Sequence, residues 1–170
     1  CLYIGIFLDD AEMVNDAIAY YKTGKGGGCI TEGIVFGGQP VEMGRDQPHA
    51  AIGIDAYADL CQALWNQGLD MYAYEDNLLL KGFEYYARFN LEHPVDWTPI
   101  DYHGHKFYYP APSNNAPSSM PNNRILANEA VYHHYVDRKG LDAPYLRAMM
   151  KLKNVEVLTG MMLSLIHISE

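Results

Sequence analysis

The sequence predicts an all-α fold. Five segments repeat apolar residues at the three- and four-residue spacing that buries one face of a helix. Glycine or proline stands near the ends of these segments, where helices start and stop. Strand-like runs do not alternate with the helical ones, so the pattern does not favour a parallel α/β sheet. With 170 residues, the chain is long enough for one domain with a sizeable core.

The first expected helix begins after Asp9 and Asp10, whose side chains can cap its N-terminus, and it ends near Gly24. Its apolar stripe consists of Met13, Val14, Ala17, Ile18 and Tyr21. A glycine run at 26–28 follows this helix. Because no Lys-Ser or Lys-Thr comes after the run, and no strand-to-helix pattern surrounds it, we interpret it as a turn rather than a phosphate-binding loop.

Residues 31–41 alternate weakly between apolar and polar side chains. They predict either an extended loop or a short hairpin that turns at Gly37-Gly38. The longest helical pattern comes next, over 48–67, where Pro48 suits the first turn and Gly68 follows the last. Its apolar positions are Ile54, Tyr57, Ala58, Cys61, Leu64 and Trp65. We expect this segment to be the central helix.

Three more helices are expected, one before a long loop and two after it. Residues 75–90 repeat apolar side chains at helical spacing, and residues 125–138 form a fourth helix that Gly140 stops. A fifth helix begins at Pro144. Residues 92–123 lack periodicity and are rich in proline, asparagine, tyrosine and histidine. Because loops of this length are commonly functional and this one is aromatic, we expect it to pack over a cleft.

A dense polar cluster, 42–49, directly precedes the central helix. The N-terminus of a helix has free backbone N–H groups and the positive end of the dipole, so it favours an anion. We therefore hypothesise that this cluster forms one wall of a site for an acidic sugar. Structural roles are the alternative, with His49 capping the helix and Arg45 and Asp46 forming an ion pair.

Charge and composition argue against several partners. The formal net charge is −9, and no basic patch carries interleaved aromatic side chains, which argues against nucleic acid. No apolar run approaches the ~18 residues of a membrane span. The three cysteines have no metal or disulfide spacing, and the histidines at 103, 105, 133 and 134 lack a third ligand placed by spacing. We therefore expect no membrane insertion, no metal and no other cofactor.

Four stretches of the chain carry a family resemblance. They are Gly44-Arg-Asp-Gln-Pro-His49, Ala63-Leu-Trp-Asn-Gln-Gly-Leu-Asp-Met-Tyr72, Leu79-Leu-Lys-Gly-Phe-Glu-Tyr85 and Glu129-Ala-Val-Tyr-His-His-Tyr-Val-Asp-Arg-Lys-Gly-Leu141. Taken together in this order, they resemble the alginate lyase domain of bacterial polysaccharide lyases. The similarity is closer to family thirty-eight than to family five, and it covers roughly residues 4–150.

The resemblance implies an incomplete (α/α) toroid, in which paired helices ring a central cleft. It implies metal-independent β-elimination of an acidic polysaccharide, alginate first and glucuronan-type polymers next, and export to the periplasm or out of the cell. The chain departs from the family pattern at His133, where an asparagine is typical. We expect 1–162 to be a partial domain without its C-terminal cleft residues, which puts its own activity in doubt. Residues 163–170 resemble translated sequencing-adapter read-through and are expected to be a non-native tail, with a short strand as the alternative.

β-Elimination needs donors that neutralise the substrate carboxylate, a base that removes the C5 proton and an acid that protonates the oxygen leaving C4. We expect His49 and Tyr132 to be the proton-transfer pair. Gln47, Asn66 and Arg124 would hold the carboxylate, and Arg124 would also favour the Tyr132 phenolate needed if the tyrosine is the base.

Three further substrate contacts are expected, from Arg45, Gln67 and His134. Tyr135 follows Tyr132 by three residues, so it could take the proton-transfer role instead. Asn66 and Gln67 could also serve only to end the central helix before the glycine that follows them.

Two other functions stay open. A toroid glycoside hydrolase would need two opposed carboxylates, for which Asp46 and Glu129 could be recruited. A non-catalytic protein of the same fold would bind oligouronate and leave its length unchanged.

Overall fold

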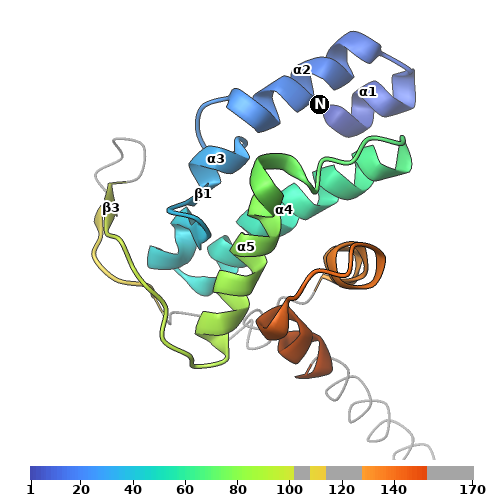
Figure 1. The fold of residues 1–170 in the computed structure, drawn as a ribbon. Helices are drawn as coiled ribbons and strands as arrows, with labels where there is room; N and C mark the ends of the chain where they lie inside the picture. The colour runs from blue at the N-terminus through green and yellow to red at the C-terminus, as the bar shows by residue number, and fades with distance from the viewer. Residues whose placement is uncertain (102–107, 114–127, 153–170) are drawn as a thin grey trace, which may run out of the picture.

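A computed structural model describes residues 1–101, 108–113 and 128–152. This part of the chain is mostly helical, with two short antiparallel strand pairs, so the predicted all-α class is confirmed (Figure 1). Arg124 and the proposed tail at 163–170 lie outside the described residues. Within the described ranges, no helix is both long and apolar enough to cross a membrane.

The chain begins with a helical hairpin. Helix α1 (Leu2–Leu8) ends at Asp9, whose φ of 54° is left-handed. Helix α2 (Ala11–Thr23) begins at Asp10, whose side chain accepts a hydrogen bond from the Met13 N–H at 3.0 Å. This cap and the end at Gly24 confirm the first predicted helix, whereas α1 was not expected as a separate helix. The two helices lie side by side at one end of the molecule (Figure 1).

A short helix and a hairpin lead to the central helix. Helix α3 (Ile30–Gly33) is followed by β1 (Ile34–Val35) and β2 (Gln39–Pro40), which pair antiparallel with Ile34 opposite Pro40. The turn uses Gly37 and Gly38 at positive φ, and the Gly38 N–H donates to the Val35 carbonyl at 3.0 Å. The hairpin alternative for residues 31–41 is therefore confirmed. A 3-10 turn, η1 (Val41–Gly44), then leads to α4.

Helix α4 (Gln47–Asn66) is the centre of the fold. Its predicted apolar positions form one buried face, which packs against α5 and the segments before and after it. The buried residues with less than a tenth of their surface exposed include Ala50, Ile54, Tyr57, Ala58, Cys61 and Leu64. Fully burying one such aliphatic or aromatic side chain contributes about 1.5–3 kcal/mol, so this face is a main source of the stability of the domain.

Helix α5 (Tyr74–Asn90) packs against α4 and β2. Its first turn is unusual because Glu75, Asp76 and Asn77 all have left-handed backbone angles, with φ between 49° and 59°. The left-handed conformation costs roughly 1–2 kcal/mol per non-glycine residue, so the surrounding contacts must hold this turn. Farther along, Gly82 lies against Ile34, where an added Cβ would come within 2.6 Å of the isoleucine Cδ1.

The described parts of the long loop contain no helix. Strands β3 (Ile100–Asp101) and β4 (Tyr108–Tyr109) pair antiparallel in this loop. The loop packs against η1, because the Trp97 Nε1–H donates to the Tyr109 carbonyl at 3.2 Å and both side chains lie against Gly44. It therefore covers the region just before α4.

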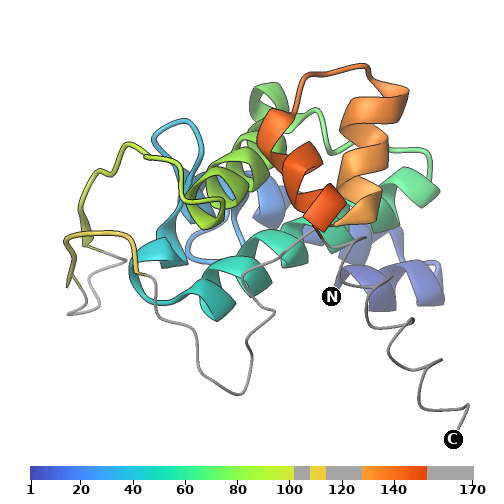
Figure 2. The ribbon, with the colours of Figure 1, turned by 90° about the horizontal axis from the view of Figure 1, so that it is seen from below.

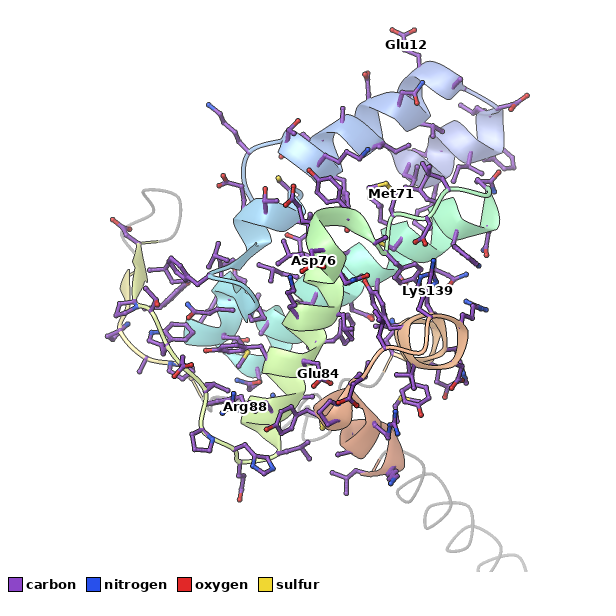
Figure 3. The ribbon with its side chains drawn as sticks, viewed as in Figure 1. Glu12, Met71, Asp76, Glu84, Arg88 and Lys139 are labelled. Atoms are coloured by element: carbon purple, nitrogen blue, oxygen red, sulfur yellow. The ribbon has the colours of Figure 1, made fainter. Side chains whose placement is uncertain are left out.

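The last described segments lie against α4 and α5 (Figure 2). Helix α6 (Glu129–Tyr132) continues as η3 (His133–Arg138), a π-helical turn, and residues 144–152 are helical again. Asn128 caps α6 and also donates to Asp55 of α4 at 2.6 Å. Glu84 of α5 points toward the helix at 144–152 (Figure 3) and accepts the backbone N–H of Leu146 at 2.7 Å.

Candidate functional site

Asp46 and His49 form a close pair at the N-terminus of α4. Asp46 is the N-cap residue, and its Oδ1 accepts the backbone N–H of His49 at 2.9 Å. The Nδ1 of His49 lies 2.7 Å from both carboxylate oxygens of the same aspartate. One carboxylate thus fixes both the backbone and the ring of His49, because an N-cap residue and the third helical position face each other.

This contact sets the proton positions on the imidazole. A carboxylate only accepts hydrogen bonds, so the Nδ1 of His49 must carry the proton. In the neutral ring the other nitrogen, Nε2, then has a free lone pair. Burial acts to raise the pKa of Asp46, but the hydrogen bonds from His49 and the nearby Arg45 charge lower it overall. Asp46 therefore stays ionised, and His49 is arranged as a base.

His49 lines a small open cavity of about 160 Å³. Other residues that line it are Gly27, Gly33, Glu42, Ala50, Gly53 and Tyr57. The volume is below the roughly 300–1,000 Å³ of pockets that hold drug-sized ligands. The lining also includes Pro40, Val41, Ile52 and Ile54, so the cavity is largely apolar and has room for one small unit of a ligand.

Arg45 stands beside this pair, with about half of its side chain exposed. Its guanidinium lies 3.7 Å from Glu42 and 3.8 Å from Asp46. The expected ion pair between Arg45 and Asp46 is therefore present, but it is long and partly solvated. Such exposed pairs contribute little, so the guanidinium of Arg45 can turn away from them toward another anion at small cost.

Gln47 is fully buried, although the sequence led us to expect a substrate contact. Its Nε2 donates to the Ser113 carbonyl at 2.6 Å, and its Oε1 accepts from Asn90 at 2.8 Å. Both ends of the amide are thus used to join α4, α5 and the long loop. The structure gives Gln47 a packing role, and a contact with substrate stays a prediction.

The structure separates Asn66 and Gln67 from His49, with which the sequence analysis grouped them. They lie at the opposite end of the 20-residue helix α4, which at 1.5 Å of rise per residue is about 25 Å away. Both are exposed, and the Oδ1 of Asn66 accepts a hydrogen bond from Gln62 at 2.8 Å. The structure therefore does not bring Asn66 and Gln67 together with His49, and their contact with substrate stays a prediction.

His134 also lies at the far end of α4, and it is buried. Its ring packs edge-on against Trp65, with 4.7 Å between ring centroids, and its side chain is 1% exposed. It contacts protein groups here, so a role in touching substrate stays a prediction. Tyr132 is partly buried and lies one turn after Asn128. Because Asn128 donates to Asp55, α6 lies beside α4 beyond its first two turns. No contact between Tyr132 and His49 occurs among the described residues.

Sequence reasoning treated Asp46 only as a partner of Arg45 or as an acid. Asp46 stands three residues before His49 at the start of a predicted helix, which is the spacing between an N-cap residue and the residue that it faces. This spacing could have predicted the Asp46–His49 pair. Asp70, which lies 3.5 Å from the Nε2 of His134, has no comparable local signal, because the two meet only in the folded chain.

The described residues contain no group of three or more histidine, cysteine, aspartate or glutamate side chains that could hold a metal ion. Comparison with known protein families, curated proteins and solved structures finds no match to this chain. The function must therefore be argued from the site and from the sequence motifs.

Proposed function

We propose that this protein is a polysaccharide lyase that cleaves a uronic-acid polymer by β-elimination, with alginate as the first substrate to test. In this proposal the fold is an incomplete (α/α) toroid and the protein works in the periplasm or outside the cell. The observation that carries it is the Asp46–His49 pair at the N-terminus of α4, whose histidine lines a cavity. The motif around this pair is one of the four that resemble the alginate lyase domain.

His49 is the base in this mechanism. With Nδ1 held by Asp46, its Nε2 removes the proton at C5 of the uronate. The electron pair left at C5 spreads onto the adjacent carboxylate, forms the C4–C5 double bond and expels the oxygen at C4. Asp46 stabilises the imidazolium that His49 becomes, because its carboxylate lies 2.7 Å from Nδ1.

The substrate carboxylate gains charge during this step and needs positive groups nearby. Arg45 supplies a half-exposed guanidinium, and the first turn of α4 supplies the positive end of a helix dipole. Tyr132 as the acid at O4, and Arg124, Asn66, Gln67, Gln47 and His134 as substrate contacts, stay predictions. A hydrolase that uses Asp46 as its general acid is less suitable, since the lowered pKa keeps this carboxyl ionised.

Product analysis tests the reaction class. The protein is incubated with alginate and a panel of other polyuronates, and the products are followed by ultraviolet absorbance and mass spectrometry. The proposal predicts rising absorbance and oligomers with an unsaturated end, lighter than the corresponding hydrolysis products by the mass of one water (about 18 Da), because hydrolysis adds a water and elimination does not. Saturated products would identify a hydrolase, and binding with no change in chain length would identify a non-catalytic polyuronate-binding protein.

A further inference from the structure

A second polar cluster surrounds the buried His134, at the other end of α4 from the proposed site. The imidazole stacks on the Tyr72 ring, with centroids 4.0 Å apart and an angle of 18° between the planes. The edges of Trp65 and Tyr135 close two more sides, at 4.7 and 5.3 Å. The ring thus lies in an aromatic box built from α4, the α4–α5 connection and η3.

Neither ring nitrogen of His134 has a hydrogen-bond partner in the described structure, although both are shielded from solvent. Buried polar atoms almost always have a partner, so two unpaired nitrogens on one ring require an explanation. Asp70 is the nearest candidate, because its Oδ1 lies 3.5 Å from the Nε2 of His134. That distance is too long for a good hydrogen bond but needs only a small movement to become one.

Asp70 is already engaged by another cation. Its Oδ2 pairs with the Nζ of Lys139 at 2.8 Å, and its Oδ1 accepts the Tyr72 backbone N–H at 3.1 Å. About a quarter of the Asp70 side chain is exposed, so water and protons reach this carboxylate. Asp70 is therefore shared by a charged lysine and by a histidine that could become charged.

Other charged and titratable groups also surround the box. Arg138 and Lys139 lie over the Trp65 ring, at 5.6 and 5.9 Å from its centroid, and both oppose a positive charge on His134. Tyr72 and Tyr135 line the box itself. Cys61 of α4 acts electrostatically on both tyrosines, and Asp59 of α4 acts on Tyr72. Asp70 is the one negative group in this set that favours a protonated His134.

The backbone joins the histidine to the lysine. His134 belongs to the π-helical turn η3, and the Lys139 N–H donates to the His134 carbonyl at 3.1 Å. Isolated π-helical turns are frequent at functional sites. A change in how Asp70 is shared would therefore act on both ends of one turn. Figure 3 shows Lys139 at the end of this turn, directed toward the C-terminal end of α4.

We propose that His134, Asp70 and Lys139 form a proton-operated switch, in which a proton taken up by His134 moves Asp70 from Lys139 to the histidine. When His134 is neutral, Asp70 holds Lys139 and the π-helical turn packs against α4. When His134 gains a proton from solvent, its Nε2–H donates to Asp70 Oδ1 and the Lys139 pair loosens. The packing of η3 against the end of α4 therefore depends on pH.

The direction of this dependence follows from the surroundings of the ring. Burial, together with the Lys139 and Arg138 charges, lowers the pKa of His134, and Asp70 opposes them. The folded protein therefore binds a proton at His134 less readily than the unfolded chain, whose pKa is near 6.5. Asp70 is therefore fully paired with Lys139 above about pH 6.5. This pairing is lost as the pH falls from there through the lower pKa that His134 has in the folded protein.

Proton NMR of the full chain at a series of pH values tests the switch. The proposal predicts that the His134 ring titrates while the fold persists, and that the proton signals of the Lys139 side chain shift at the same midpoint. Lys139→Met keeps the apolar stem but removes the competing charge, so it should raise that midpoint by at least about 0.5 pH unit. Asp70→Asn should lower the midpoint, and His133→Gln, at an exposed histidine of the same turn, should leave it unchanged.

Two results would overturn the switch. A His134 signal that stays constant until global acid unfolding would show a histidine with a packing role alone. A midpoint that is the same in the wild type, Lys139→Met and Asp70→Asn, each shown to be folded by circular dichroism, would show that Asp70 is not exchanged. Neither result depends on lyase activity, so this inference and the proposed function fail independently.

Discussion

Replacing Asp46 tests whether one carboxylate both caps α4 and holds His49. Asp46→Ala removes the acceptor for the His49 backbone N–H, at 2.9 Å, and for the ring Nδ1, at 2.7 Å. Asp46→Asn removes the negative charge but keeps a capping oxygen, because asparagine caps helices about as well as aspartate. The two variants therefore separate the contribution of the cap from that of the charge.

The expected loss for Asp46→Ala is about 1–2 kcal/mol. Loss of an N-cap costs about 0.5–2 kcal/mol. The pair with His49 adds at most about 1 kcal/mol, because the histidine side chain is 44% exposed and the pair is screened by solvent. Asp46→Asn should lose less than about 1 kcal/mol. For a chain of this length, each kcal/mol lowers the melting temperature by about 2–4 °C.

Thermal unfolding followed by circular dichroism measures these losses, and Asp10→Ala is the matched control. Asp10 caps α2 by accepting the Met13 N–H at 3.0 Å but holds no histidine. Asp10→Ala should therefore show the cost of a cap alone, and Asp46→Ala should lose at least as much. Equal melting temperatures for wild type and Asp46→Ala would refute the reasoning.

The effect of Asp46 should also depend on pH. Its pKa is lowered in the folded protein, where the hydrogen bonds from His49 outweigh the effect of burial. The folded state thus binds fewer protons than the unfolded state, so the stabilisation is complete above about pH 4 and is lost as the pH falls through the folded pKa. The difference in stability between wild type and Asp46→Asn should narrow below about pH 4. A difference that is constant with pH would contradict this explanation.

Three further substitutions test the packing of the fold. Glu84→Ala removes the carboxylate that accepts the Leu146 N–H at 2.7 Å, and it should lower the free energy of unfolding in urea by about 1–3 kcal/mol. An unchanged urea midpoint would rule out this cap. Gly33→Ala would place a Cβ 1.8 Å from the Tyr57 hydroxyl and should cost about 1–3 kcal/mol. At Gly53 an added Cβ would meet no atom within 4 Å, so Gly53→Ala should instead stabilise α4 by up to about 1 kcal/mol. If Gly33→Ala and Gly53→Ala shifted the melting temperature in the same direction, the packing described for Gly33 would be contradicted.

The helices were predictable where their signals are local. Helix α4 was found within one residue at each end, because its apolar spacing and the flanking Pro48 and Gly68 all lie in one stretch of sequence. The left-handed turn at the start of α5 was not predictable, since Asp76 and Asn77 tolerate left-handed angles singly but three such residues in succession are not expected from residue type. The π-helical turn was also missed, because one extra residue in a turn hardly changes the apolar spacing of a short segment.

The candidate site was only partly predictable. The polar cluster at the N-terminus of α4 is local, so His49 and Arg45 were found from residue types and from the helix start. Asn66 was wrongly grouped with them, although the predicted helix length already placed it at the other end. The burial of Gln47 and His134 depends on elements far away in the sequence, and no local pattern reveals it.

The initial rate of unsaturated product formation by wild type and by His49→Gln tests the central claim most directly. The account predicts that wild type raises the ultraviolet absorbance of a polyuronate solution. It predicts that His49→Gln, which keeps a polar side chain but cannot accept a proton, is slower by about 10²–10⁴-fold while its melting temperature changes little. Equal rates for the two proteins would contradict the assignment of His49 as the base, and saturated products from wild type would contradict the proposed lyase.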